Sequence, residues 1–308
     1  QEIIGNFMKK NIFKQINKND LSKFRSWEGG AGVGNIQSFT GGAEFKSRFY
    51  NRNFHPLDDA FSFFDESFLV KKYNGLINKL IPYIPFLKYL IIRIVELKRY
   101  HKNIYNLRLI DKYDLIKNLD ESLTKISDSS FGLDEKNTIK IEEKIYTNTF
   151  LDCLVEIYYI KKNTDFNSIN TIVEIGAGFG ILASAFLKLN NKIKYLIVDI
   201  SPAIFFSQYY LSNLGYKVFG YDEIIKEDAI DVEKIFKSYD VICLPTWKLA
   251  KLKDFNFDLF INIGSFQEIE KKQALNYLKI FKKNLKKYIY LNNAIYGHDK
   301  AKKKGSFG

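Results

Sequence analysis

The sequence is poor in cysteine and arginine, and each shortage excludes a class of protein. Two cysteines, Cys153 and Cys243, occur in 308 residues, too few for a disulfide framework and without the histidine spacing of a structural zinc site. Arginine supplies six of the 47 basic residues, although it is the usual bidentate reader of phosphates and bases. A reducing compartment is therefore expected, and a nucleic-acid partner is disfavoured.

The sequence also lacks a long apolar run. The best membrane candidate, residues 80–97, is interrupted by Pro82, Pro85 and three charged residues, so it does not read as a span of about 20 apolar residues. We expect a buried helix there, with a helix lying on a membrane as the alternative. The opening residues show no signal peptide. The expected location is cytoplasmic, with peripheral contact to the inner face of the membrane left open.

What the sequence has in excess is positive charge. The net charge is +12, while 46% of residues are apolar and 27% are charged, as in a globular protein. We interpret most of this excess as a solvated lysine-rich surface. A partner that carries diphosphate groups would also suit it.

The pattern of apolar residues and glycines changes along the chain, and this change predicts two regions. Residues 1–138 read as a mainly helical substrate or cap region, in which a glycine-rich stretch at 29–34 is a flexible loop or, alternatively, a lid. Residues 139–162 read as one more helix. Residues 139–308, which begin with that helix, are predicted to form a second domain.

The second domain alternates short apolar strands with helices. The pattern predicts an α/β fold, a doubly wound Rossmann-like, mostly parallel sheet. The expected strands are 171–175, 195–200, 240–244, 258–263 and 287–292, and the expected helices are 181–189, 202–214 and 270–285. Residues 217–221 could form a further short strand, whose place in the sheet the sequence does not give.

The most informative segment joins the first of these strands to the first helix. Three glycines, Gly176, Gly178 and Gly180, fill the turn between them. Glycine allows close backbone approach to a ligand, and the helix start offers N–H groups to an anionic group. The spacing G-x-G-x-G is one residue shorter than the dinucleotide fingerprint. Glu174 precedes it and could attract a cationic amine.

A second signal ends the next strand. Asp199 follows Gly176 by 199 − 176 = 23 residues, where a carboxylate can accept hydrogen bonds from ribose hydroxyls. Together the bend and the acid predict a nucleoside ligand. The combination with Glu174 suits the amino-acid end of S-adenosylmethionine.

At this point the sequence resembles a known family. VEIGAGFG, at 173–180, followed by VDISP, at 198–202, is similar to motif I and the second-strand acid of class I S-adenosylmethionine-dependent methyltransferases. With QYYL at 208–211 and YLNN at 290–293, the stretch DLFINIGSFQEI at 258–269 resembles the sugar O-methyltransferase family of bacterial polysaccharide gene clusters. The resemblance covers about residues 140–295.

The resemblance implies a role for each matching position. The methionine end of the cofactor would lie along Glu174, Gly176, Ala177, Gly178 and Gly180. Ribose and adenine would lie against Asp199, Ile200 and Pro245. The sulfonium and the acceptor would face Asn262 and Ser265.

The class usually ends with two further strands, whereas 308 − 292 = 16 residues follow Asn292. We therefore expect a chain that continues past Gly308 or a shorter sheet.

The catalytic base is the least defined part of the prediction. Glu268 and His298 are the candidates, because each follows a strand that ends beside the expected acceptor. For Glu268 the alternative is a capping box, S-F-Q-E, in which it would bond the Ser265 N–H. No metal ligands are identified, and a need for a divalent metal is left open.

The predicted activity is methylation of a sugar hydroxyl, with a nucleotide sugar or a lipid-linked glycan as acceptor. Two alternatives stay open. The first is a methyltransferase acting on nucleic acid or on another small molecule. The second is a non-catalytic scaffold that keeps the nucleoside pocket. The sequence makes no prediction of oligomeric state.

Overall fold

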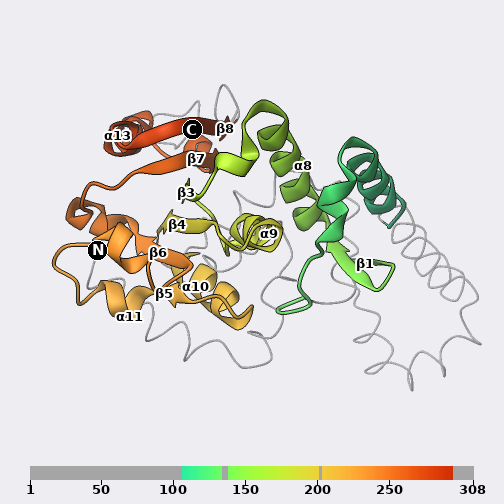
Figure 1. Ribbon diagram of the computed structural model, residues 1–308, viewed down its shortest axis with the longest axis horizontal. Coiled ribbons are helices and arrows are strands. Elements are labelled where there is room, and N and C mark those ends of the chain that lie inside the picture. The colour runs from blue at the N-terminus through green and yellow to red at the C-terminus, as the bar shows by residue number, and fades with distance from the viewer. Residues whose placement is uncertain (1–105, 134–137, 201–202, 294–308) are drawn as a thin grey trace, which may run out of the picture.

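The centre of the molecule is a six-stranded parallel sheet (Figure 1). The computed structural model describes residues 106–133, 138–200 and 203–293. The predicted helices before residue 106 lie outside them. Across the sheet the order is β5–β6–β4–β3–β7–β8, and every pairing is parallel. The strands are β3 (Thr171–Ile175), β4 (Lys194–Asp199), β5 (Val218–Phe219), β6 (Val241–Pro245), β7 (Phe257–Ile263) and β8 (Leu285–Asn292).

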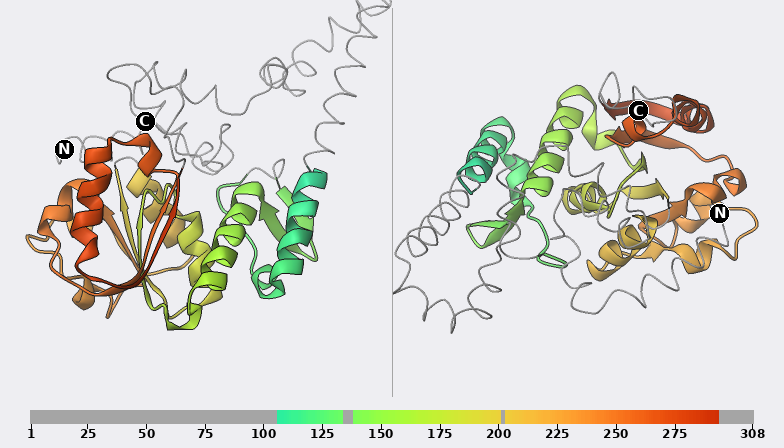
Figure 2. Two further views of the ribbon diagram at one scale, coloured as in Figure 1. Left: turned by 90° about the horizontal axis from the view of Figure 1, so that it is seen from above. Right: turned by 180° about the vertical axis from the view of Figure 1, so that it is seen from behind.

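Helices cover both faces of this sheet, as Figure 2 shows most clearly in its left view. One face packs against α8 (Asn148–Asn163), α9 (Ile181–Leu189) and α10 (Ala203–Asn213). The other face packs against α11 (Tyr221–Ile224), α12 (Val232–Ile235) and α13 (Lys271–Lys282). Strands buried on both faces are continuously apolar rather than alternating. This layering confirms the predicted doubly wound Rossmann-like fold.

Short 3₁₀ segments connect several of these elements. They are η3 (Glu121–Lys125), η5 (Phe166–Ser168), η6 (Thr246–Lys251) and η7 (Phe266–Glu268). The short β5, which the sequence could not place, lies at the outer edge of the sheet beside β6. Among the described residues, none of the helices combines the length and the apolar character needed to cross a bilayer.

The predicted helix at 139–162 is wrong in its first part. Residues 138–147 form an antiparallel hairpin of β1 (Thr138–Ile141) and β2 (Lys144–Thr147). Its turn places Glu142 and Glu143 at positive φ, +49° and +64°. The helix starts only at Asn148, because the Thr147 hydroxyl accepts a hydrogen bond from the Phe150 N–H and caps it. Before the cap, the β-branched residues Ile139, Ile141, Ile145 and Thr147 occur at every second position of each strand, and such residues favour strands over helix.

The strand order contains one reversal, and it sets the position of the site. From β3 the chain proceeds through β4 and β6 on one side, then returns to pair β7 on the other side of β3. Parallel strands end at the same edge, here called the carboxyl edge. In open α/β sheets a ligand binds outside that edge, where the strand order reverses. The point lies between β3 and β7.

Candidate functional site

The bend after β3 has a backbone that only glycine adopts easily. Gly176, Gly178 and Gly180 all have positive φ, at +77°, +62° and +87°. A Cβ built on Gly176 would lie 2.3 Å from Ser265 Oγ and 2.4 Å from Ser265 Cβ. One built on Gly180 would lie 3.0 Å from Leu211 Cδ1. The first glycine therefore serves two needs, its torsion and the close approach of the loop after β7.

Asp199, at the end of β4, holds the middle of this bend. Its side chain is 8% exposed, and its Oδ2 accepts a hydrogen bond from the Gly178 N–H at 2.9 Å. Oδ1 accepts from the Ile200 N–H at 2.7 Å. From α10, the Ser207 hydroxyl donates to the Gly178 carbonyl at 2.6 Å. The structure thus brings the predicted bend and the predicted acid into direct contact.

The environment of Asp199 raises the pKa of its carboxyl group. Burial raises the pKa of this carboxyl to about 7, against the opposing effect of its two backbone hydrogen bonds, and the nearby charge of Glu268 adds to the rise. Pro245 lies opposite Asp199 in the strand register. Ile200 is 47% exposed. A buried acid beside an exposed apolar side chain can receive a sugar hydroxyl and the face of a base together.

Asn262 joins the ends of β3 and β7. This side chain is fully buried, and its Nδ2 donates to the Ile175 carbonyl at 2.8 Å and to Ser265 Oγ. Its Oδ1 accepts from the Phe266 N–H at 3.1 Å. Ser265 Oγ also donates to the Ile175 carbonyl, at 3.2 Å. Both predicted residues thus shape the loop against Gly176.

Glu174 lies inside the sheet, beneath the bend. Its side chain is 4% exposed, and its Oε2 accepts a hydrogen bond from the Tyr195 hydroxyl at 2.8 Å. Burial raises the pKa of this carboxyl to about 8, although the bond from Tyr195 lowers it. The carboxyl is therefore mostly protonated at neutral pH. Its predicted contact with a cofactor amine stays a prediction.

The two candidates for the base have different outcomes. Glu268 is exposed, in η7, and its charge acts on Asp199, so it lies on the carboxyl edge as expected. The Ser265 side chain makes no capping bond to η7 and bonds Asn262 instead, whereas the predicted bond from the Glu268 side chain to the Ser265 N–H stays a prediction. His298 lies outside the described residues. The role of Glu268 as base stays a prediction.

Two further residues of this edge were missed by the sequence reasoning. Ser207 lies in the middle of α10, where a lone serine gives no signal. Tyr277, on α13, stacks on Phe266 with ring centroids 6.4 Å apart and planes 5° from parallel. Burial raises its pKa, and the charge of Asp199 adds to the rise. Because Tyr277 and Asp199 are distant in sequence, only the folding of the sheet brings α13 near the Asp199 carboxylate.

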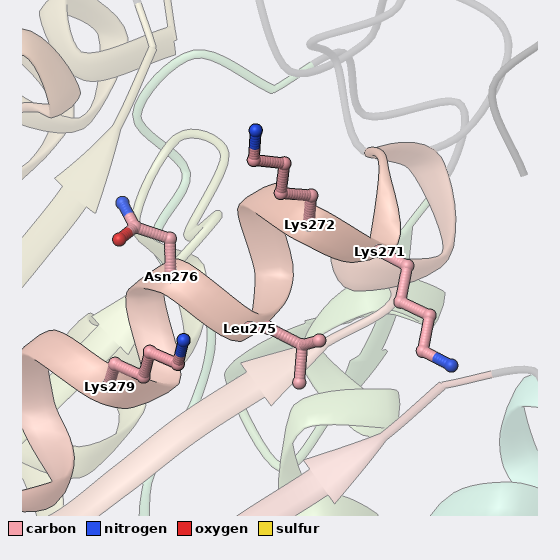
Figure 3. Close-up of a pocket in the computed structure, with 5 residues that line it drawn as sticks. All are labelled: Lys271, Lys272, Leu275, Asn276 and Lys279. Carbon is pink, nitrogen blue, oxygen red and sulfur yellow. The ribbon is translucent and has the colours of Figure 1, made fainter.

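A hollow along α13 is lined by lysines, as Figure 3 shows. Its lining consists of Lys271, Lys272, Leu275, Asn276 and Lys279. The lysine side chains point in different directions, so their ammonium groups do not converge on one point. This face provides positive potential rather than a built phosphate site. Within the described ranges, no group of acids, cysteines and histidines is arranged to hold a metal ion.

Comparison with known proteins gives distant structural similarities alone. No protein-family model and no curated protein matches the sequence. Among solved structures, the mitomycin 7-O-methyltransferase MmcR is 14% identical over 46% of this chain and 38% of its own, with a TM-score of 0.33.

Two other solved structures are similar to the chain. The plantazolicin methyltransferase BpumL, in complex with SAH, is 13% identical over 67% of this chain and 61% of its own, with a TM-score of 0.28. The S-adenosylmethionine-dependent methyltransferase SibL is 12% identical over 63% and 55%, with a TM-score of 0.29. The chain spans less than two thirds of the length of each of these proteins. Its own strand order identifies the Rossmann-like fold.

Proposed function

We propose that this chain is an S-adenosylmethionine-dependent methyltransferase that methylates a sugar hydroxyl. The observation that carries the proposal is the contact between Asp199 and the glycine bend, at the reversal of strand order. A carboxylate at this point accepts hydrogen bonds from ribose hydroxyls, and the exposed Ile200 beside it offers an apolar surface to adenine. The residues present therefore fit a nucleoside.

Each part of the edge has a separate task in this reaction. When bound, the sulfonium cofactor supplies an activated methyl group. The bend holds the donor close to the backbone, and Asp199 fixes its ribose. Asn262 and Ser265 keep the ends of β3 and β7 together, so that donor and acceptor meet in a fixed geometry. Positioning of this kind contributes about 7–11 kcal/mol to lowering a barrier.

The acceptor is a nucleotide sugar or a lipid-linked glycan. The resemblance of 258–269 to sugar O-methyltransferases supports a sugar. The lysine side chains of α13 support an acceptor with diphosphate groups, because α13 begins eight residues after β7 ends at the carboxyl edge (271 − 263 = 8). Such an acceptor places the enzyme in the cytoplasm, in contact with the membrane if the glycan is lipid-linked.

Calorimetry with S-adenosylhomocysteine tests the nucleoside site. The full chain should bind it, and Asp199→Ala should weaken the affinity by about 5- to 150-fold, the equivalent of about 1–3 kcal/mol for lost hydrogen bonds to a buried carboxylate. Asp240→Ala is the control, since Asp240 lies just before β6, at the opposite edge of the sheet. If the folded wild-type chain fails to bind, the methyltransferase class is excluded.

A further inference from the structure

A second polar cluster lies on the carboxyl edge, between α8 and the end of β8. The Glu156 carboxylate accepts a hydrogen bond from the Tyr290 hydroxyl at 2.5 Å and one from Asn292 Nδ2 at 2.8 Å. The acid comes from α8 and both donors come from β8, elements that Figure 1 shows side by side. No sequence motif joins residues 134 and 136 positions apart.

This cluster continues the row of groups that begins at Asp199. The Gly264 N–H donates to the Asn292 carbonyl at 2.9 Å. Asn293 Nδ2 donates to the Asn262 carbonyl at 3.3 Å. Ser265, the residue after Gly264, lies against the glycine bend. The loop after β7 therefore separates the cluster from the proposed donor site. Thus the cluster lies where an acceptor would approach.

The hydrogen-bonding groups of this cluster include more acceptors than the protein satisfies. Asn293 Oδ1 is buried and accepts no hydrogen bond from the residues that the structure describes. Each oxygen of Glu156 accepts one hydrogen bond, and a carboxylate oxygen has two lone pairs. The buried Asn293 Oδ1 costs free energy while it has no donor, and the partly buried Glu156 keeps lone pairs open, so a ligand with several donors would be favoured here. Neighbouring hydroxyls of a sugar ring provide them.

An aromatic ring beside the cluster fits the same kind of ligand. Tyr159 lies three positions after Glu156 on α8, so the two side chains are neighbours on one face of the helix, and it is 50% exposed. Exposed tyrosine rings offer an apolar face with a polar rim. Such a face can cover the C–H side of a sugar ring, while the carboxylate and the amides take its hydroxyls.

We propose that Glu156, Asn292 and Asn293 form the binding site for the hydroxyls of the acceptor sugar, with Tyr159 against the ring. This inference rests on the proposed function and assigns its substrate a place. It names as the substrate class a hexose or a related polyol ring, recognised through hydroxyl donors. The site is distinct from the residues that would hold the nucleoside.

Saturation-transfer NMR on the full chain tests the site. The probes are UDP-glucose, UDP-galactose, UDP-N-acetylglucosamine and methyl α-D-glucopyranoside, each added to protein saturated with S-adenosylhomocysteine. We expect saturation of the ring protons of at least one probe. Asn293→Ala should weaken that binding at least about fivefold, as for a lost buried hydrogen bond, while its stability in urea falls by no more than the loss of its bond to the Asn262 carbonyl accounts for. If Asn293 had a purely structural role, its substitution would weaken binding of the probe only by lowering the stability of the fold.

The controls separate the possible failures. Glu156→Gln keeps the size of the side chain and should also weaken binding of the probe, whereas Asn213→Ala, at the exposed end of α10, should not. If no probe is saturated while S-adenosylhomocysteine binds normally, the acceptor site is refuted and the nucleoside site stands. Equal binding by wild type and Asn293→Ala also refutes it. Loss of S-adenosylhomocysteine binding in the wild type refutes the proposed function itself.

Discussion

Gly176 offers the sharpest test of the geometry at the bend. In Gly176→Ala the new Cβ meets Ser265 Oγ at 2.3 Å and Ser265 Cβ at 2.4 Å, in a backbone with a φ of +77°. A left-handed torsion costs a non-glycine residue about 1–2 kcal/mol. Crowding in a packed region adds about 1–3 kcal/mol. We expect the free energy of unfolding to fall by about 2–5 kcal/mol, measured from the urea midpoint at constant slope.

Gly215 is the matched control for the torsion. Its φ is +89°, and a Cβ there would meet nothing within 4 Å. Gly215→Ala should therefore lose only the torsional part, about 1–2 kcal/mol. In a Ser265→Gly background, Gly176→Ala should lose no more than that, because the crowding atoms are gone. The reasoning is refuted if Gly176→Ala costs no more than Gly215→Ala, or if Ser265→Gly leaves its cost unchanged.

Three further predictions concern the buried polar groups. S-adenosylhomocysteine should bind more tightly at pH 8 than at pH 6, because ribose hydroxyls donate to ionised Asp199, whose pKa is about 7; calorimetry with Asp199→Asn should show no such trend. Glu174 binds a proton more tightly in the native state (pKa about 8) than at its ordinary value of 4.5, so wild-type stability in urea should fall as pH rises between them, and Glu174→Gln should flatten that fall. An equal slope in both proteins would contradict this account. Asn262→Ala removes the shorter of the two side-chain bonds to the Ile175 carbonyl and the acceptor of the Phe266 N–H, and should cost at least about 2 kcal/mol by urea unfolding. Asn213→Ala, which removes an exposed hydrogen bond, should cost under about 1 kcal/mol and is the comparison.

The sheet could be predicted from the sequence because its signals are local. Buried parallel strands are short apolar runs, and the glycines that follow 171–175 mark where the first of them ends. The same reasoning failed at 139–147, where apolar residues at short spacing fit a helix and a hairpin alike. Thr147 carried the missing signal, as a capping residue inside the predicted helix.

The candidate site could be predicted only where its residues follow a strand directly. The glycine bend and Asp199 both do, and the Gly178 N–H joins them. Glu156 and Ser207 lie within helices, and their partners are distant in sequence, so no spacing pattern indicates them. Asn262 was predicted at the correct edge. Its burial, and hence its bonds to backbone rather than an open surface, depends on packing that the sequence does not show.

The bond from Asn262 to the Ile175 carbonyl also has a consequence for folding, because it joins residues 87 positions apart. Contacts between distant residues form late, since the entropy of closing the intervening chain opposes them. During synthesis the glycine turn leaves the ribosome well before the strand that braces it. A nascent chain that stops short of β7 therefore has the turn without its support, and we expect it to acquire nucleoside affinity only once that strand has docked.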